Sequence, residues 1–131
     1  MGWLRSVQKA DGSFGESLLS YDSPSTKAQG PSTASQTAWG LIGLLAGTQS
    51  NAPAVTKAVS YLVHRQQEDG SWSEPEFTGT GFPGVFYLKY HLYRNSFPVY
   101  ALARYFNQSR RSAEYAALRL QPGEFKLRSG F

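Results

Sequence analysis

Apolar side chains recur at helical spacing in three stretches of the chain. The first covers residues 34–47, with Ser32 or Thr33 available as its N-cap and a glycine at its end. The second begins at Pro53, because proline suits the first turn of a helix. Its apolar positions at i, i+3, i+4, i+7 and i+8 are Val55, Ala58, Val59, Leu62 and Val63. A third helix is predicted to start near Pro98. No long stretch alternates with period two, so the pattern predicts an all-α fold.

A gapless repeat links two of these regions. Residues 3–16 align on residues 61–74 with an offset of 58 residues. Both copies contain a leucine, a glutamine and an Asp-Gly-Ser triplet at the same positions, and an aromatic residue stands near each end. Asp-Gly is typical of a helix stop, because glycine accepts the left-handed conformation that closes a helix. Each copy therefore predicts the end of a helix followed by a turn.

The spacing of the repeat favours a particular all-α architecture. Long polar loops separate the predicted helices, as in residues 18–30 and 73–81. A two-helix unit of 58 residues with such loops favours an α/α toroid over a compact solenoid. A ring of six units needs twelve helices of roughly 12 residues each, which is more than the chain's 131 residues can supply. The sequence therefore predicts an incomplete toroid, part of a larger (α/α)6 barrel.

Composition narrows the range of functions. Hydrophobic residues make up 40% of the chain and aromatic residues 15%, which is enough to build a folded core. Cysteine is absent, which excludes a disulfide framework, a thiolate zinc site and a cysteine nucleophile. The first residues do not resemble a signal peptide, and no apolar run is long enough to span a bilayer. The two histidines have no spaced carboxylate partner, so no metal site is expected.

The net charge of +4 is concentrated near the C-terminus. Residues 108–131 contain five basic and two acidic side chains, whereas residues 1–107 contain eight and seven. The body of the chain therefore lacks the basic stripe that nucleic-acid binding needs, and no nucleic-acid partner is expected.

Four aromatic residues suggest a chemical role. Phe82, Phe86, Tyr90 and Tyr93 recur at i, i+4, i+8 and i+11. If Pro83 opens a helix, the four rings fall within an arc of about 80°. An aromatic face attracts a cation by about 0.5–2 kcal/mol per contact, so this stripe predicts a wall that stabilises positive charge. Core packing is the ordinary alternative for such a stripe. Lys89 borders the same face and is expected to extend outward to water.

Several motifs resemble those of one enzyme family. Gln8-x3-Gly12-x-Phe14 and Gln66-x3-Gly70-x-Trp72 resemble the QW motifs of triterpene cyclases. Residues 32–41 and 79–94 resemble the C-terminal region of bacterial squalene–hopene cyclase. The likeness covers residues 1–107, which are expected to form the C-terminal part of the cyclase barrel. Residues 108–131 are expected to form a poorly ordered basic tail.

The resemblance implies cyclisation of squalene to hopene and hopanol through carbocations, without a metal or organic cofactor. In the family, the middle aspartate of an Asp-x-Asp-Asp motif protonates the terminal alkene. The only aspartates here are Asp11, Asp22 and Asp69, which do not form that motif. An alkene is too weak a base to be protonated without a strong, positioned acid. We therefore expect the chain to be inactive alone and to need the N-terminal remainder of the enzyme as its partner.

The resemblance also implies roles for individual residues. Phe82 and Phe86 line the family's cavity and stabilise later ring cations, while Tyr90 and Tyr93 lie towards the protonation end. Leu88 matches a cavity-shaping position, although the predicted helix places it on a different face. The motif residues are predicted to be structural, with each glutamine bonding backbone groups at a neighbouring helix end and the aromatic ring packing over it; they are Gln8, Gly12, Phe14, Gln66, Gly70 and Trp72. Because squalene dissolves in bilayers, the intact enzyme is expected on the cytoplasmic membrane face without spanning it.

A second class of function stays open at this point. A non-catalytic α/α scaffold would use the same aromatic groove to bind a prenyl chain or a partner helix. Protein prenyltransferase β-subunits share the toroid, but they need a zinc-binding cysteine, which this chain lacks. Polysaccharide-acting α/α barrels need acid–base groups in the groove, whereas Glu68, Glu74 and Glu76 cluster around a turn.

Overall fold

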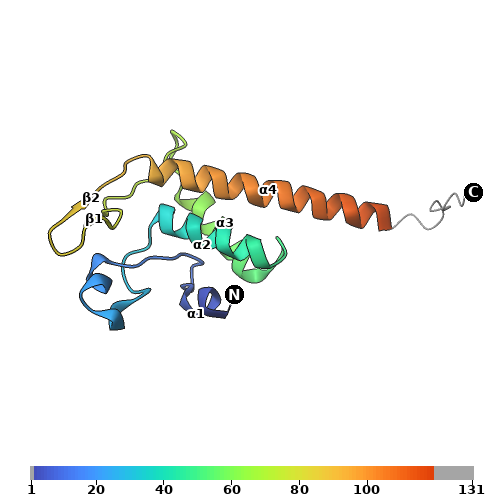
Figure 1. Ribbon diagram of the computed structural model, residues 1–131. Helices are drawn as coiled ribbons and strands as arrows, with labels where there is room; N and C mark the ends of the chain where they lie inside the picture. Colours follow the sequence, from blue (N-terminus) through green and yellow to red (C-terminus); the bar gives the residue numbers. More distant parts are fainter. Residues whose placement is uncertain (1, 120–131) are drawn as a thin grey trace, which may run out of the picture.

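The computed structural model describes residues 2–119 (Figure 1). Its α-helices are α1 (Gly2–Val7), α2 (Ala34–Gly47), α3 (Pro53–Arg65) and α4 (Tyr93–Arg119). Two short 3-10 helices, η1 (Leu18–Tyr21) and η2 (Pro24–Thr26), lie in the first long loop. A two-stranded antiparallel sheet pairs β1 (Thr80–Phe82) with β2 (Phe86–Leu88). The all-α prediction is confirmed for most of this part of the chain, with the small sheet as an addition.

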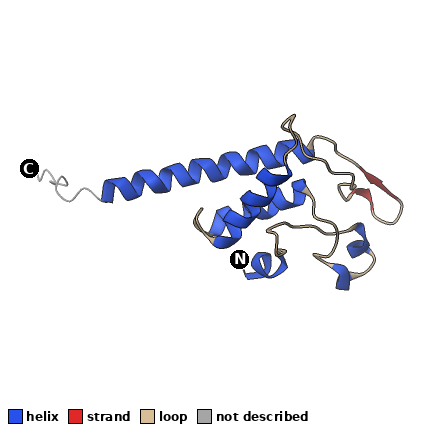
Figure 2. Ribbon diagram, turned by 180° about the vertical axis from the view of Figure 1, so that it is seen from behind, coloured by secondary structure: helices blue, strands red, loops and turns tan. Residues whose placement is uncertain are grey.

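Helix α2 occupies the centre of the packed region. It contacts α1, α3 and the first half of α4, whereas the second half of α4 extends beyond the other elements (Figures 1 and 2). The core between these helices is formed by Phe14, Ala34, Ala38, Leu41, Leu44, Leu45, Val55, Ala58, Leu62, Trp72 and Ala101. None of the helices described is long and apolar enough to cross a membrane.

Local signals set the bounds of α2 and α3, and both predicted helices are confirmed. The N-cap of α2 is Thr33, whose hydroxyl accepts a hydrogen bond from the Gln36 amide at 3.2 Å. Helix α3 begins with Pro53, whose missing N–H would have had no partner in the first turn.

Helix α4 differs from the prediction at both ends. It begins at Tyr93, five residues before the predicted start, so Pro98 lies inside the helix. It also continues through residues 108–119, where a poorly ordered tail was expected. This stretch contains no glycine or proline, and an ion pair of 3.6 Å joins Arg110 to Glu114 one turn apart, which favours a helix. The predicted boundary at residue 107 therefore falls within α4. The remainder of the predicted tail, residues 120–131, lies outside the described residues.

The two repeated segments form turns with the same internal hydrogen bonds. We call residues 8–14 the first turn and residues 66–72 the second turn. Gln8 Nε2 donates to the Gly12 carbonyl and Gln66 Nε2 to the Gly70 carbonyl, both at 2.9 Å. Gly12 and Gly70 have φ angles of 89° and 82°, in the region that favours glycine. The identical residues of the repeat therefore build one local structure twice.

The two turns also bind α2 and α4 in the same way. The amide of Phe14 donates to Thr37 Oγ1 at 3.1 Å, and the amide of Trp72 donates to Asn95 Oδ1 at 3.2 Å. Thr37 lies in α2 and Asn95 lies 58 residues later in α4. Helices α2 and α4 are therefore corresponding elements of the repeat, packed side by side.

A buried carboxylate two residues after the second turn binds the start of α2. Glu74 is buried, and its carboxylate accepts hydrogen bonds from the Ser35 amide at 2.8 Å and the Ser35 hydroxyl at 2.7 Å. Ser35 lies at the N-terminal end of α2, where the helix dipole favours a negative charge. Glu74 thus caps the N-terminal end of α2, although it lies 39 residues from Ser35 in the sequence.

The two turn glycines provide a matched test of the packing. A Cβ on Gly12 would collide with the backbone of Lys57 in α3, whereas the nearest atom to a Cβ on Gly70 would be Gln66 Nε2 at 3.9 Å. A positive φ costs a non-glycine residue about 1–2 kcal/mol, and an overpacked contact adds about 1–3 kcal/mol. Gly12→Ala should therefore lower the free energy of unfolding by about 2–5 kcal/mol and Gly70→Ala by about 1–2 kcal/mol, measured by urea denaturation. Equal losses would contradict this packing.

Asp11 makes the stability of the first turn depend on pH. Its carboxylate accepts hydrogen bonds from the Ser13 hydroxyl at 2.6 Å and amide at 3.0 Å, which lower its pKa below the ordinary 3.8. The carboxylate therefore stabilises the fold above that value, and the gain is lost as pH falls through the lowered pKa. Asp11→Asn should be less stable than the wild type at neutral pH, with a difference that shrinks in acid. Solvent screening should keep this difference small.

Urea denaturation between neutral and strongly acidic pH measures the difference in free energy of unfolding between Asp11→Asn and the wild type. Asp22→Asn is the control, because it lies outside both turns. A loss of stability in Asp11→Asn that stays constant from neutral to strongly acidic pH would contradict the assignment.

Candidate functional site

Residues 80–88 form a β-hairpin, so the prediction of a helix opened by Pro83 was wrong. The Val85 amide donates to the Phe82 carbonyl at 2.9 Å, and Gly84 has a φ of 75°. Proline followed by a left-handed glycine is typical of a type II turn. Gly81 also has a positive φ, of 117°, which a helix cannot accommodate. Gly81 and Gly84 therefore indicate a hairpin, although the spacing of the aromatic residues also fits a helix.

The hairpin brings three predicted site residues onto one face. Phe82 pairs with Phe86 across the strands, and Leu88 lies two residues beyond Phe86. Because side chains alternate along a strand, all three point to the same side. The two phenyl rings are 5.2 Å apart at their centroids. Leu88, which an ideal helix would have turned away from the phenylalanines, therefore shares their face after all.

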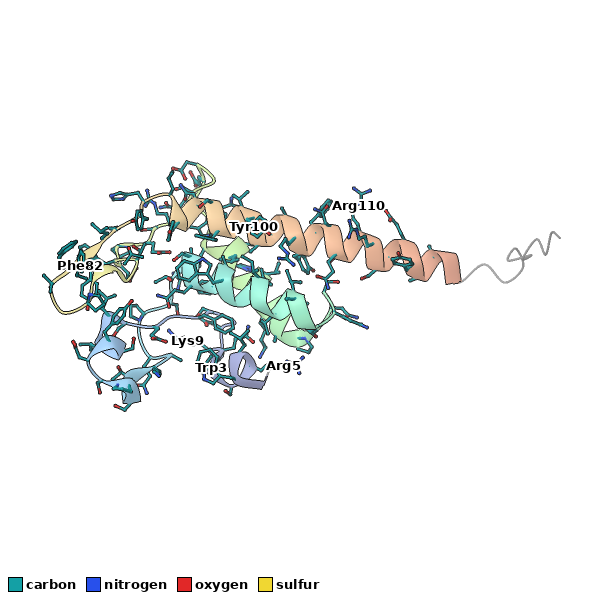
Figure 3. The ribbon with its side chains drawn as sticks, in the orientation of Figure 1. Trp3, Arg5, Lys9, Phe82, Tyr100 and Arg110 are labelled. Atoms are coloured by element: carbon teal, nitrogen blue, oxygen red, sulfur yellow. The ribbon has the colours of Figure 1, made fainter. Side chains whose placement is uncertain are left out.

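This hairpin face is open to solvent in the described chain. The exposed fractions of Phe82, Phe86 and Leu88 are 64%, 47% and 43%. The sticks in Figure 3 place Phe82 at the outer part of the hairpin, away from the helices. We call these three residues the hairpin face.

The opposite side of the hairpin is held by the first long loop. Tyr87 points to this side, and its ring stacks on Tyr21 with centroids 5.9 Å apart. The Tyr21 hydroxyl donates to the Gly79 carbonyl at 2.6 Å. The loop thus fixes the hairpin from behind and leaves the hairpin face uncovered.

Tyr90 and Tyr93 form a second aromatic group at the start of α4. Their rings stack at 5.1 Å, and Tyr93 meets Phe97 edge-on at 5.0 Å. Trp39 of α2 packs against Phe97 at 5.2 Å and Tyr93 at 6.0 Å. We call these four residues the helix-end cluster. Edge-to-face contacts of this kind orient the rings as well as burying them.

The structure therefore divides the predicted wall of four rings into two groups. Phe82 and Phe86 are on the hairpin, whereas Tyr90 and Tyr93 are at the helix end, and no ring contact joins the pairs among the described residues. The expectation that the four rings share one helical face was wrong, because only the last of them lies in a helix. The two groups are nevertheless close in sequence, since Leu88 is separated from Tyr90 by one residue.

That intervening residue is Lys89, and its charge is bound to the backbone. Its ammonium group donates a hydrogen bond to the Pro75 carbonyl at 2.7 Å. Pro75 belongs to the loop after the second turn, which β1 and β2 follow. Within the part of the chain that the structure describes, no group of three His, Asp or Glu side chains could hold a metal ion.

A cavity of about 600 Å³ lies between α1, α2 and the long loops. Its aromatic lining residues are Trp3, Phe14, Tyr21, Trp39 and Phe77. A neighbouring cavity of about 400 Å³ is lined in part by Tyr87 and Phe77. None of Phe82, Phe86, Tyr90 and Tyr93 lines either cavity. Trp39 connects the larger cavity to the helix-end cluster, because it lines this cavity and also contacts Tyr93.

Sequence reasoning missed Trp39 and Phe97 as members of the aromatic site. The repeat contained the signal, because the two residues are 58 positions apart and occupy the same place in α2 and α4. Tyr21 was also missed, and no pattern in its Ser-rich loop indicated the contact with Tyr87.

Known proteins match most of this chain. The family model of the squalene–hopene cyclase C-terminal domain matches residues 1–107. The squalene–hopene cyclase of Bradyrhizobium diazoefficiens is 51% identical over 107 residues, which cover 80% of this chain and 16% of that protein. The enzyme of Alicyclobacillus acidocaldarius is 52% identical over 91 residues, 70% of this chain and 14% of that protein.

A relative that is not named as a squalene–hopene cyclase also matches this chain. Dammaradiene synthase of Dryopteris crassirhizoma is 49% identical over 117 residues, covering 79% of this chain and 17% of that protein. The chain thus spans about one sixth of the length of these relatives. Its mostly helical architecture agrees with the α/α toroid that the spacing of the repeat predicts. From the domain match and these identities, the chain belongs to the squalene–hopene cyclase family, with residues 1–107 corresponding to its C-terminal domain.

Proposed function

We propose that this chain supplies part of the wall of the cavity in which a squalene–hopene cyclase converts squalene to hopene and hopanol. The observation that carries the proposal is the hairpin face, on which Phe82, Phe86 and Leu88 are presented together and uncovered. The squalene–hopene cyclases among the relatives support the choice of substrate. The rest of the cyclase would be the partner that closes the cavity.

The exposure of the hairpin face supports a surface that another component covers. Leaving apolar side chains in water forgoes about 25 cal/mol for each Å² that could be buried. Contiguous exposed apolar residues commonly mark a ligand or protein contact. In the complete enzyme, these side chains would contact an apolar polyene or line the space that holds it.

The chemistry of the hairpin face suits the cationic intermediates of such a reaction. Protonation of an alkene leaves a carbocation, and each ring closure moves the positive charge along the chain. Loss of a proton then gives hopene, whereas addition of water followed by loss of a proton from its oxygen gives hopanol. A phenyl ring stabilises such a charge through its π-electron face and has no lone pair that would trap the cation. Leu88 would contribute shape alone. Phe82 and Phe86 are therefore suited to hold a positive charge without reacting with it.

The helix-end cluster would serve the same cavity in a more rigid way. Tyr93 is held between Tyr90, Phe97 and Trp39, so its ring has little freedom to turn. A ring fixed before the reaction stabilises developing charge without a cost of reorganisation. Tyr90 and Tyr93 are proposed to lie towards the end at which the alkene is protonated.

The test needs a protein that contains a proton donor. The chain has no Asp-x-Asp-Asp motif and is expected to form no hopene from squalene by itself. A chimera solves this, with residues 1–107 replacing the matching segment of the Bradyrhizobium diazoefficiens cyclase, to which they are 51% identical. This chimera should convert squalene to hopene, as measured by gas chromatography.

In the chimera, replacing both phenylalanines by leucine should slow cyclisation. Phe82→Leu with Phe86→Leu keeps the apolar surface and removes two cation–π contacts of about 0.5–2 kcal/mol each, which corresponds to a roughly 5- to 900-fold loss of kcat/KM. The matched control is Val85→Ala, which removes an exposed apolar side chain from the same turn. Unchanged turnover in the double variant, or an equal loss in the control, would contradict the proposed role.

A further inference from the structure

The hairpin that carries Phe82 and Phe86 has few bonds of its own. β1 and β2 contain three residues each. Thr78 extends the pairing, because its amide and its hydroxyl both donate to the Leu88 carbonyl, at 3.2 and 2.8 Å. A two-stranded hairpin is marginally stable in water unless something packs against it. The position of the hairpin face therefore depends on the contacts behind the hairpin.

Tyr21 of the 3-10 helix η1 makes contacts behind both strands. Its hydroxyl bonds the carbonyl of Gly79, the residue before β1, and its ring stacks on Tyr87 of β2 with 29° between the ring planes. Figures 1 and 2 both show the hairpin beside the 3-10 helices of this loop. Tyr21 thus reaches one strand through a hydrogen bond and the other through its ring.

Tyr87 carries this contact to the turn of the hairpin. Its hydroxyl accepts a hydrogen bond from the amide of Gly84 at 3.2 Å, so one ring spans the back of the hairpin from β2 to the turn. Tyr87 lies between Phe86 and Leu88 in the same strand, and its side chain points to the opposite side. A displacement of Tyr87 therefore moves the hairpin face as well.

Open space borders the contact between the two tyrosines. Tyr21 lines the cavity of about 600 Å³, and Tyr87 lines the neighbouring cavity of about 400 Å³. Among the described residues, Tyr21 is the one aromatic ring that stacks on Tyr87. Removing the Tyr21 ring would enlarge this space and leave the back of the hairpin without its aromatic neighbour.

We propose that Tyr21 is a positioning residue for the cyclisation, which holds Phe82 and Phe86 where they meet the later ring cations. Tyr21 acts through Tyr87 and the hairpin backbone, from the side opposite the hairpin face. The inference rests on the proposed function, because it concerns the same two phenylalanines. It adds a residue of the first long loop to the determinants of the product.

The position of the two phenyl rings affects how far cyclisation proceeds. A ring stabilises a cation that lies within about 6 Å of its centroid. If the rings move away, the later cations are stabilised less, and further ring closure slows. The preceding carbocation then has time to lose a proton to water, which gives an alkene with fewer rings and a hydronium ion. A displaced hairpin therefore lowers the share of hopene and hopanol in the product.

The chimera of the cyclase tests this consequence by gas chromatography of all cyclised products. In Tyr21→Leu, the ratio of hopene plus hopanol to incompletely cyclised products should fall roughly 2- to 13-fold, the effect that one aromatic pair supports. Tyr21→Phe keeps the ring on Tyr87 and should recover most of this loss. The value of kcat/KM for consumption of squalene should change less than the ratio, because protonation precedes the later ring closures.

A matched control separates positioning from a general effect on the loop. Leu19 is exposed in the same 3-10 helix and has no ring that could stack on Tyr87. Leu19→Ala should therefore leave the product ratio of the chimera unchanged. Thermal unfolding followed by circular dichroism checks that each variant of the chimera remains folded at the assay temperature.

The 131-residue chain reports the geometry directly. In the ¹⁵N-labelled chain, Tyr21→Leu should shift the amide signal of Gly84, because the Tyr87 hydroxyl that accepts its hydrogen bond moves. Tyr21→Phe should shift this signal less, and Leu19→Ala should leave it in place. An unchanged Gly84 signal in Tyr21→Leu would contradict the transmission through Tyr87.

A double-mutant cycle tests whether Tyr21 acts through the phenylalanines. In the Phe82→Leu, Phe86→Leu chimera, the rings that Tyr21 is proposed to position are absent. Adding Tyr21→Leu to this variant should therefore leave its product ratio unchanged, because the two effects are not independent. An equal fall in the ratio with and without the phenylalanines would show that Tyr21 acts elsewhere and would overturn the proposal.

Two further results would overturn the proposal. One is a fall in kcat/KM of Tyr21→Leu with an unchanged product ratio, which indicates a structural role alone. The other is a product ratio of Tyr21→Phe as low as that of Tyr21→Leu, because the stacked ring would then have no effect. Either result leaves the proposed function intact as long as the phenylalanine double variant is impaired. An unimpaired double variant would overturn the proposed function and this inference together.

Discussion

The close approach between a glycine turn and the start of a helix is the constraint on which this structure depends. Gly12 has no Cβ, so the backbone of α3 can lie directly against the first turn, where the Gln8 amide binds the Ala54 carbonyl. Helix α3 is thereby placed beside α2, and α2 beside α4. A side chain at this one position would collide with the Lys57 backbone, so the packing of α3 requires a glycine here.

The packing of α2 and α4 in turn places the aromatic groups. Trp39 and Phe97 occupy equivalent positions in the two helices and meet edge-on, which fixes Tyr93 between them. The hairpin precedes α4 directly and is held from behind by Tyr21. Its other face, with Phe82 and Phe86, is left open. One packing arrangement thus produces both a rigid aromatic cluster and an uncovered aromatic surface.

The sequence predicted the elements whose causes are local. Thr33 and Pro53 define the starts of α2 and α3 through capping and proline chemistry, and the Asp-Gly-Ser repeat defines both turns. The hairpin was missed because Phe82, Phe86 and Tyr90 also fit helical spacing, and the choice depends on the left-handed glycines Gly81 and Gly84.

Other features depend on tertiary contacts that no local pattern reveals. The sequence shows Glu74 only as one of three glutamates near a turn, yet it caps α2 through Ser35, 39 residues away. Because proline favours a first turn, the sequence predicts the start of α4 near Pro98, but that residue lies inside the helix and is buried. The family resemblance implied a role for Leu88 alongside the phenylalanines. The strand geometry explains this, because alternate side chains of a strand share a face, whereas an ideal helix would turn Leu88 away from the phenylalanines.

If the phenylalanines of the hairpin face attract positive charge, the chimera should bind a cation mimic more tightly than a neutral ligand of the same shape. A long alkyl chain ending in a trimethylammonium group imitates a greasy carbocation, and the same chain ending in a tert-butyl group has the same shape without the charge. Titration calorimetry of both ligands should show tighter binding of the ammonium compound, with the preference lost in the Phe82→Leu, Phe86→Leu double variant. Equal affinity for the two ligands, or a preference that survives the loss of both rings, would show that the two phenylalanines do not attract positive charge.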